Sequence, residues 1–164
     1  MAFTKKQREE RKNKGLCIEC NNLSTANSLR CEKCNKRRNQ WRKKKYHQWK
    51  EKGLCPFCGV KTLSNKNVCE KHYLIQVSLD RLGTRSLWKE LKELLEKQKY
   101  KCALTGDSIS LETNIELDHI IPTSNSGKQK LSNVRWVTKE ANRLKQDLTD
   151  EKLKELCKKI LKTI

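Results

Sequence analysis

The sequence predicts a small α+β protein in which two zinc-stabilised modules, linked by basic helices, precede a β–β–α unit with flanking helices. Three observations support this prediction: a duplicated set of metal-ligand residues, a strongly basic segment between the copies, and two short apolar strands followed by an amphipathic helix. Of the 164 residues, 35% are hydrophobic and 35% are charged. Because that is a thin supply of core for one globule, we expect several small units.

Seven cysteines and one histidine form two copies of one pattern, and each ligand of the second copy lies 38 residues after its counterpart. Two closely spaced pairs suit one tetrahedral ion with every position filled, so we predict two structural Zn²⁺ ions that do no chemistry. Disulfides are the alternative, but they need an oxidising compartment and leave the histidine unexplained. The ligand sets are Cys17, Cys20, Cys31 and Cys34, then Cys55, Cys58, Cys69 and His72.

The charge of the chain points to a polyanionic partner. Lys and Arg number 38 against 19 acidic residues, and residues 1–72 hold 20 of the basic and 6 of the acidic ones. A field this dense attracts nucleic acid, so we expect double-stranded DNA as the partner. A basic but inert solvated surface is the alternative. An anionic membrane is disfavoured because the basic stretches lack a clean apolar face.

Residues 35–50 contain no Gly or Pro and are predicted to form a helix between the two zinc modules. Trp41, Tyr46 and Trp49 are interleaved with its cations and are expected to pack on the zinc modules. A helix that contacts phosphates is the functional interpretation, and a solvated connecting helix is the alternative. The candidate DNA-binding residues here are Arg37, Arg38, Arg42, Lys43, Lys44 and Lys45.

Changes in composition divide the chain into four parts. These are a basic N-terminal segment (1–14), a first zinc module with its basic helix (15–52), a second zinc module (53–80) and a C-terminal domain (86–164). The N-terminal segment is expected to form a short charged helix that becomes ordered on nucleic acid. Residues 73–85 are predicted to be a mixed linker that ends at a break near Gly83.

The C-terminal domain is expected to begin with an amphipathic helix over 86–101, which Ser86 can cap. Strands are predicted over 115–121 and 133–137, separated by the polar loop 123–130, and a helix follows over about 138–147. A last helix begins at Thr149. The apolar stripe of the first helix is Leu87, Leu91, Leu94 and Leu95, and the later helix buries Val137, Ala141, Leu144 and Leu148. Cys102 and Cys157 lack partners at metal spacing and are predicted to be packing residues.

Neither a membrane-spanning nor a secretory segment is expected from the sequence. No run of 18 apolar residues is present, so no transmembrane helix is expected. The N-terminus MAFTKKQREERKNKG lacks the apolar stretch of a secretory signal. We therefore expect a cytoplasmic protein that has no membrane partner and binds DNA as a monomer.

One stretch carries a resemblance to a known family. The run LDHIIPTSNSGKQKLSNVRWVTKEANRLK places Asp118 and His119 side by side in an apolar strand, with Asn133 and Asn142 nine residues apart and Lys145 three further on. This pattern resembles the ββα-metal (His-Me) finger of the HNH endonucleases, as does the upstream CALTG. The resemblance covers roughly residues 100–148. The last residue of the motif, Asn142, is His in many members of the family. This H-N-N form of the motif resembles the nuclease domain of RNA-guided CRISPR effectors.

The resemblance implies a metal-dependent hydrolysis of phosphodiester bonds. His119 would be the general base, Asn133 would hold its ring, and Asp118 with Asn142 would bind one divalent ion, Mg²⁺ or alternatively Mn²⁺. Lys145 and Arg143 would meet the phosphate. Adjacent strand residues point to opposite faces, so Asp118 and His119 can share a site only at a bulge or at the strand edge.

Two classes of function follow from these expectations. The first is a DNA endonuclease that nicks one strand, with the zinc modules and basic helix binding DNA. A small HNH protein with added DNA-binding modules resembles homing endonucleases, although a restriction or packaging nuclease also fits the sequence. The second class is a non-catalytic, zinc-dependent nucleic-acid-binding protein whose β–β–α unit is only structural.

Overall fold

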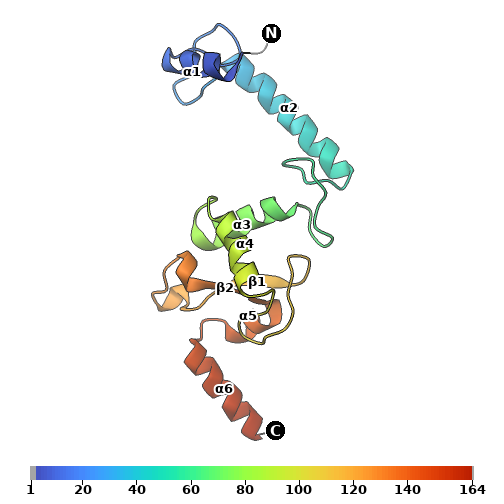
Figure 1. Ribbon diagram of the computed structural model, residues 1–164, viewed down its shortest axis with the longest axis vertical. Coiled ribbons are helices and arrows are strands. Elements are labelled where there is room, and N and C mark those ends of the chain that lie inside the picture. The colour runs from blue at the N-terminus through green and yellow to red at the C-terminus, as the bar shows by residue number, and fades with distance from the viewer. Residues whose placement is uncertain (1–2, 164) are drawn as a thin grey trace. The chain divides into compact units, whose positions relative to one another are not determined.

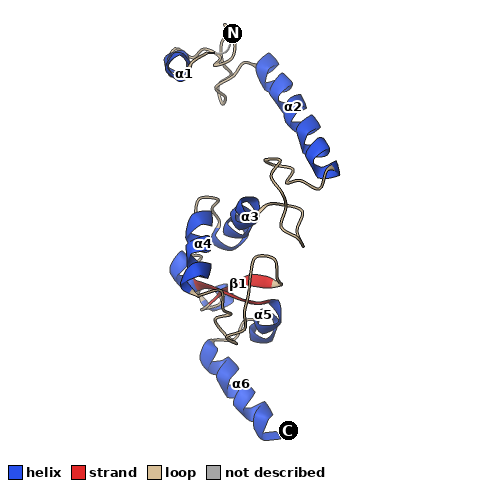
Figure 2. Cartoon of the chain, turned by 45° about the vertical axis from the view of Figure 1, so that its right-hand side comes forward, coloured by secondary structure: helices blue, strands red, loops and turns tan. Residues whose placement is uncertain are grey.

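The computed structural model describes residues 3–163, and the chain divides between Lys52 and Gly53 into two compact units (Figures 1 and 2). Unit 1 contains helices α1 (Lys5–Asn13) and α2 (Glu32–Glu51). Within the described residues, no helix is both long and apolar enough to cross a bilayer. The elements of unit 2 are α3 (Glu70–Leu82), α4 (Trp88–Lys97), β1 (Ile115–His119), the 3-10 turns Thr123–Asn125 and Leu131–Asn133, β2 (Val134–Thr138), α5 (Lys139–Lys145) and α6 (Asp150–Thr163).

Helix α1 is the short charged helix predicted for the N-terminal segment. A capping box starts it, because the hydroxyl of Thr4 accepts from the main-chain N–H of Gln7 while the Gln7 side chain accepts from the Thr4 N–H. Arg11 then donates to the carbonyls of Cys17 (2.8 Å) and Cys20. These bonds fasten α1 to the first cysteine pair.

Helix α2 confirms the helix predicted over 35–50 and begins slightly earlier, directly after Cys31. Cys34 is its one buried residue. The aromatics of this helix do not all pack as expected, because the side chain of Trp41 is 56% exposed and that of Tyr46 is also exposed. Helix α2 is therefore a largely solvent-exposed helix rich in Lys and Arg.

The segment 73–85 is mostly helix α3, and the linker predicted there is wrong. Leu74, Ser78 and Leu82 recur every fourth residue, so they share one face, and all three are buried. The Ser78 hydroxyl is satisfied by the carbonyl of Thr84 (2.6 Å). The helix ends at Gly83, whose φ of 68° is the left-handed conformation typical of a helix C-terminus.

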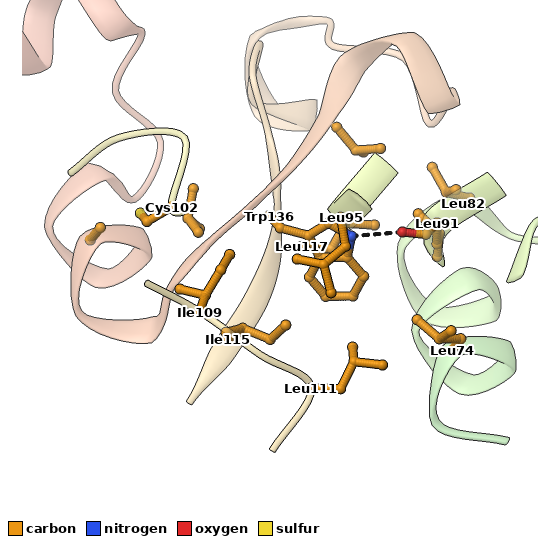
Figure 3. Packing of buried hydrophobic residues seen from close by; sticks show 13 residues of the cluster. Leu74, Leu82, Leu91, Leu95, Cys102, Ile109, Leu111, Ile115, Leu117 and Trp136 are labelled. Atoms are coloured by element: carbon orange, nitrogen blue, oxygen red, sulfur yellow. Dashed lines mark hydrogen bonds between the residues drawn. The ribbon is translucent and has the colours of Figure 1, made fainter. Parts of the chain in front are cut away.

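Strands β1 and β2 form an antiparallel pair whose two faces are both covered. Leu117 lies opposite Trp136, and their face packs on α3 and α4 through Leu74, Leu91 and neighbouring core residues (Figure 3). The indole N–H of Trp136 donates to the carbonyl of Leu91 (2.9 Å). Val137, on the other face, is buried with Ala141 of α5.

Several local predictions need correction. Helix α4 starts at Trp88, with Leu87 rather than Ser86 at the cap position and no side-chain cap bond. Strand β1 ends at His119, two residues earlier than predicted, because Ile120 begins the turn clamped by Asn133. Leu144 is 73% exposed.

The two cysteines outside the metal clusters differ. Cys102 is buried in the core cluster, which confirms that it is a packing residue. Cys157 is exposed on α6, so the same prediction for it is wrong.

The burial of α3 makes a testable prediction. Substituting Leu74→Ala should lower the free energy of unfolding of unit 2 by about 2–5 kcal/mol, because it leaves a cavity in the core. Leu144→Ala is the matched control, and its effect should stay within about 0.5 kcal/mol because that side chain faces solvent. Urea denaturation followed by near-ultraviolet circular dichroism measures both. Equal effects would contradict the placement of α3.

Candidate active site and metal centres

The first cysteine set converges on one point in unit 1. The Sγ atoms of Cys20 and Cys31 are 3.5 Å apart, and those of Cys34 and Cys20 are 3.6 Å apart. Sulfurs around a tetrahedral Zn²⁺ at about 2.3 Å lie about 3.8 Å from one another. A disulfide needs about 2.05 Å, so these two distances fit a metal centre and are too long for a disulfide.

The second set has the same geometry, with a histidine as the fourth ligand. The Nδ1 atom of His72 lies 3.3 Å from the Sγ of Cys69 and 3.5 Å from the Sγ of Cys55. All ligand atoms in each set lie within 4.8 Å of one another, so both sets can hold structural zinc. Cys69 precedes α3 and His72 lies in its first turn, so a zinc ion held by this set would fix the start of α3.

A cleft of about 200 Å³ lies at the end of β1. Asp118 and His119 pair with Arg135 and Val134 across the ribbon and so point to opposite faces. They nevertheless line the same cleft, because it lies where the strand ends. The lining residues are Arg81, Leu117, Asp118, His119, Pro122, Thr123, Asn142, Gln146 and Asp147.

The imidazole of His119 is held by the end of α3. Its Nε2 lies 3.1 Å from the main-chain carbonyl of Arg81. A carbonyl only accepts, so Nε2 carries the proton and the neutral ring keeps its lone pair on Nδ1. Burial lowers the pKa of His119 below its ordinary value and outweighs the opposing hydrogen bond to Arg81. The residue is therefore a neutral imidazole at pH 7, which suits a base.

Asp118 is buried among cations. Its Oδ2 accepts from Nε of Arg135 (3.0 Å) and its Oδ1 from Nζ of Lys145 (2.9 Å). Arg135 also donates two hydrogen bonds to the carboxylate of Asp150, from Nη1 to Oδ2 (2.7 Å) and from Nη2 to Oδ1 (2.5 Å). Hydrogen bonding to Arg135 is the main cause that lowers the pKa of Asp150. The network ties β1, β2 and the start of α6 together.

Lys145 does not face solvent. Its side chain is fully buried, and Nζ also donates to the carbonyl of His119 (2.7 Å). Helical periodicity places Leu144 outward and Lys145 inward, against Asp118. The phosphate contact predicted for Lys145 therefore does not fit its position. Arg143 is exposed on α5.

The amide of Asn142 is oriented by a carboxylate that sequence reasoning missed. Nδ2 of Asn142 donates to Oε2 of Glu116 (2.6 Å), so Oδ1 is the atom left to accept or to ligate. Glu116 lies two residues before Asp118, and period-two alternation alone places both on one strand face. That alternation was the available signal.

Asn133 contacts main chain rather than the ring of His119. Its Oδ1 accepts from the N–H of Ile121 (2.9 Å), and its Nδ2 donates to the carbonyls of Ile121 (2.9 Å) and Lys128 (3.0 Å). It closes the loop that follows His119. The imidazole ring of His119 is positioned by the end of α3 instead. The sequence did not point to Arg81, because it lies in the segment 73–85 that was predicted to be a linker.

The oxygen donors of the cleft fit a hard divalent cation. Asp118 supplies a carboxylate that keeps lone pairs beyond its two ion pairs, and Asn142 supplies an amide oxygen. Asp147 lines the same cleft as a further carboxylate. Such a sparse oxygen set suits a hard divalent ion that retains several waters.

The predicted DNA-binding residues of α2 lie on one exposed helix. Arg37 and Arg38 approach Glu19 at 3.3 and 3.8 Å. Arg42, Lys43 and Lys44 are exposed. Lys45 is half-buried, bonds Gln48 at 3.1 Å and lies 6.0 Å from the ring centre of Trp49.

Comparison with known proteins assigns part of unit 2. Residues 102–150 match the family model described as HNH endonuclease, and no curated protein matches the chain. The match contains β1, β2 and α5 and therefore most of the cleft, which supports the resemblance inferred over residues 100–148. Arg81 and both cysteine sets lie outside it.

The two metal centres are predicted to differ in what they support. The wild-type chain should carry two Zn²⁺, and Cys34→Ser should lose one while leaving the unfolding of unit 2 unchanged. His72→Ala should also lose one but destabilise unit 2, because that centre anchors the buried helix α3. His72→Cys is the matched control that restores a full ligand set. Elemental analysis with urea denaturation measures these outcomes, and fewer than two zinc ions in the wild type would contradict the prediction.

Proposed function

We propose that the protein is a metal-dependent DNA endonuclease that hydrolyses phosphodiester bonds and nicks one strand. One observation carries the proposal: a neutral imidazole with its lone pair on Nδ1 lines a cleft shared with a carboxylate and an oriented amide. Those three groups are the parts that hydrolysis of a phosphodiester requires. The HNH match over residues 102–150 supports the same reaction class.

His119 acts as the general base in this proposal. Nδ1 takes a proton from water while the water oxygen attacks phosphorus, and the bond to the 3′ oxygen breaks with the electron pair leaving on that oxygen. The Arg81 carbonyl keeps Nε2 protonated and, at the negative end of α3, favours the imidazolium that forms. Asp118 and Asn142 would hold Mg²⁺ or Mn²⁺, which supplies positive charge to the phosphate and leaving oxygens.

DNA binding is assigned mainly to unit 1. Residues up to Lys52 hold 17 basic and 5 acidic residues, and α2 presents its cations to solvent along one helix. Contacts from such a helix to phosphates release counterions and supply affinity that is independent of sequence. The first metal centre holds the N-terminal end of α2 in place through Cys31 and Cys34.

A homing-type role is the specific form of this proposal. The layout combines one nuclease domain with separate metal-stabilised modules and a basic helix, so binding and cutting are carried by different parts of the chain. Such an enzyme should cut a randomised DNA library at one position relative to a recognised sequence. Cuts spread over many unrelated sequences would argue for a non-specific nuclease.

A non-catalytic DNA-binding protein is the second candidate. It is favoured by the ion pairs on both oxygens of Asp118, which would serve a purely structural β–β–α unit equally well. Nicking of supercoiled plasmid in Mg²⁺, but not in chelator, separates the two candidates.

The role of His119 predicts a selective loss of cleavage. His119→Ala should slow nicking by about a hundredfold or more, because no other group takes the proton from water. DNA affinity and zinc content should stay close to wild type, since neither depends on the cleft. His47→Ala, the same change on the exposed face of α2, is the matched control and should nick normally. A folded His119→Ala protein that nicks at the wild-type rate would end the enzyme proposal.

The role of α2 predicts a loss of affinity with a reduced salt dependence. Replacing Arg42, Lys43 and Lys44 with Gln should weaken binding to all DNA sequences and lower the salt slope by about 0.9 for each phosphate contact removed. The same number of charges removed from α6, at Lys154, Lys158 and Lys162, is the matched control. Fluorescence anisotropy over a salt series measures both. Equal losses from the two helices would show that only net charge matters.

A further inference from the structure

Arg81 meets the cleft at the end of α3. Its main-chain carbonyl accepts a hydrogen bond from Nε2 of His119, and the residue, which is exposed, is part of the lining of the cleft that contains Asp118 and Asn142. The carbonyl is free to do so because the last carbonyls of a helix have no partner within the helix. The end of α3 is anchored, because Leu82 is buried in the core beside it.

The other cations around the cleft are already engaged. Lys145 is fully buried against Asp118, and Arg135 is only 12% exposed and bridges Asp118 to Asp150. By contrast, within residues 3–163 no carboxylate lies at ion-pair distance from the guanidinium of Arg81. Arg81 is therefore the cleft cation that can meet an anionic ligand.

Arg81 also lines a second cavity next to the cleft. It has a volume of about 280 Å³ and shares Arg81 and Leu117 with the cleft. Lys66 and Lys139 add two cations to it, and Asn114 adds an amide. Its carboxylates are Asp80 and Glu116, and Glu116 is hydrogen-bonded to Asn142. Arg81 thus lies between the cleft and a neighbouring hollow with groups that bind a continuing phosphate backbone.

We propose that Arg81 is a catalytic residue whose guanidinium binds a non-bridging oxygen of the scissile phosphate, while its carbonyl holds the base. The inference rests on the proposed nuclease function. A guanidinium donates in a planar fork that matches two phosphate oxygens, and its charge stabilises the negative charge that develops as water attacks. Because both groups belong to one residue at a helix end anchored by Leu82, one backbone position serves both the base and the phosphate.

Substitutions at Arg81 separate these two contributions, since they remove the guanidinium and keep the carbonyl on His119. Arg81→Ala should lower the single-turnover nicking rate by about a hundredfold, as for loss of one donor to a developing oxyanion. Arg81→Lys should recover part of that loss, because it restores the charge without the fork. Arg85→Ala, an exposed arginine just beyond α3, is the matched control and should nick at nearly the wild-type rate.

A modified substrate tests whether the contact is with the scissile phosphate. Two duplexes carry a methylphosphonate of either configuration at the mapped nick position, so that each lacks one non-bridging oxygen. With one configuration Arg81→Ala should cause no further loss relative to wild type, and with the other it should cause its full loss. Equal losses with both, or an Arg81→Ala rate no lower than that of Arg85→Ala, would overturn the inference.

The same assay distinguishes failure of this inference from failure of the proposed function. If wild type nicks and His119→Ala does not, the enzyme proposal stands, and a normal rate for Arg81→Ala then rejects Arg81 alone. If wild type does not nick in Mg²⁺ or Mn²⁺, both fall. Arg81→Gln is a second variant that keeps a polar side chain, and a rate as low as that of Arg81→Ala is expected.

Discussion

The packing of α3 with α4 in the core that covers one face of the two-stranded sheet is the constraint on which the rest of unit 2 depends. An isolated pair of short strands is at best marginally stable in water, so β1 and β2 need helices over both faces. Leu74 and Leu82 fasten α3 to the core that also contains Trp136. With that face buried, the last turn of α3 meets His119 through the carbonyl of Arg81, and its first turn places His72 beside the Sγ of Cys69. Helix α3 therefore contributes residues to a candidate metal site, to the hydrophobic core and to the cleft.

The opposite face of the sheet is organised by charge. Burying Asp118 with two cations costs desolvation, which is offset only if every donor and acceptor finds a partner. Each buried nitrogen and oxygen of this network has at least one partner, since Lys145 reaches both Asp118 and the carbonyl of His119 while Arg135 reaches Asp118 and Asp150. Removing one partner from such a network typically costs about 3–5 kcal/mol, so the network fixes the rotation of α5 against β1. That rotation in turn brings Asn142 to Glu116.

The internal duplication shows how one metal-anchored helix can serve two purposes. Both helices start directly after a cysteine ligand, at Cys31 and Cys69. Adding 38 to the positions of Lys36, Gln40 and Lys44 gives the buried face of α3. Two leucines and a small serine at those positions made one copy part of a core, whereas two lysines and a glutamine left the other as an exposed basic helix.

The sequence by itself determined the features that depend on neighbouring residues. Ligand spacing predicted both cysteine clusters, short apolar runs predicted the two strands, and the absence of Gly and Pro over residues 35–50 predicted α2. Only tertiary structure decided the rest. Arg81 and His119 are 38 residues apart, and no pattern in the sequence near either residue predicts their contact. The side chain of Lys145 points into the protein because the carboxylate of Asp118 is buried on the neighbouring strand. Its position in a short helix would by itself also be compatible with a solvent-exposed side chain. Asn133 was assigned to the ring but closes a loop, because its partners are main-chain groups that any residue could supply. Local pattern fixes which elements form, and packing over long separations fixes which side chains meet.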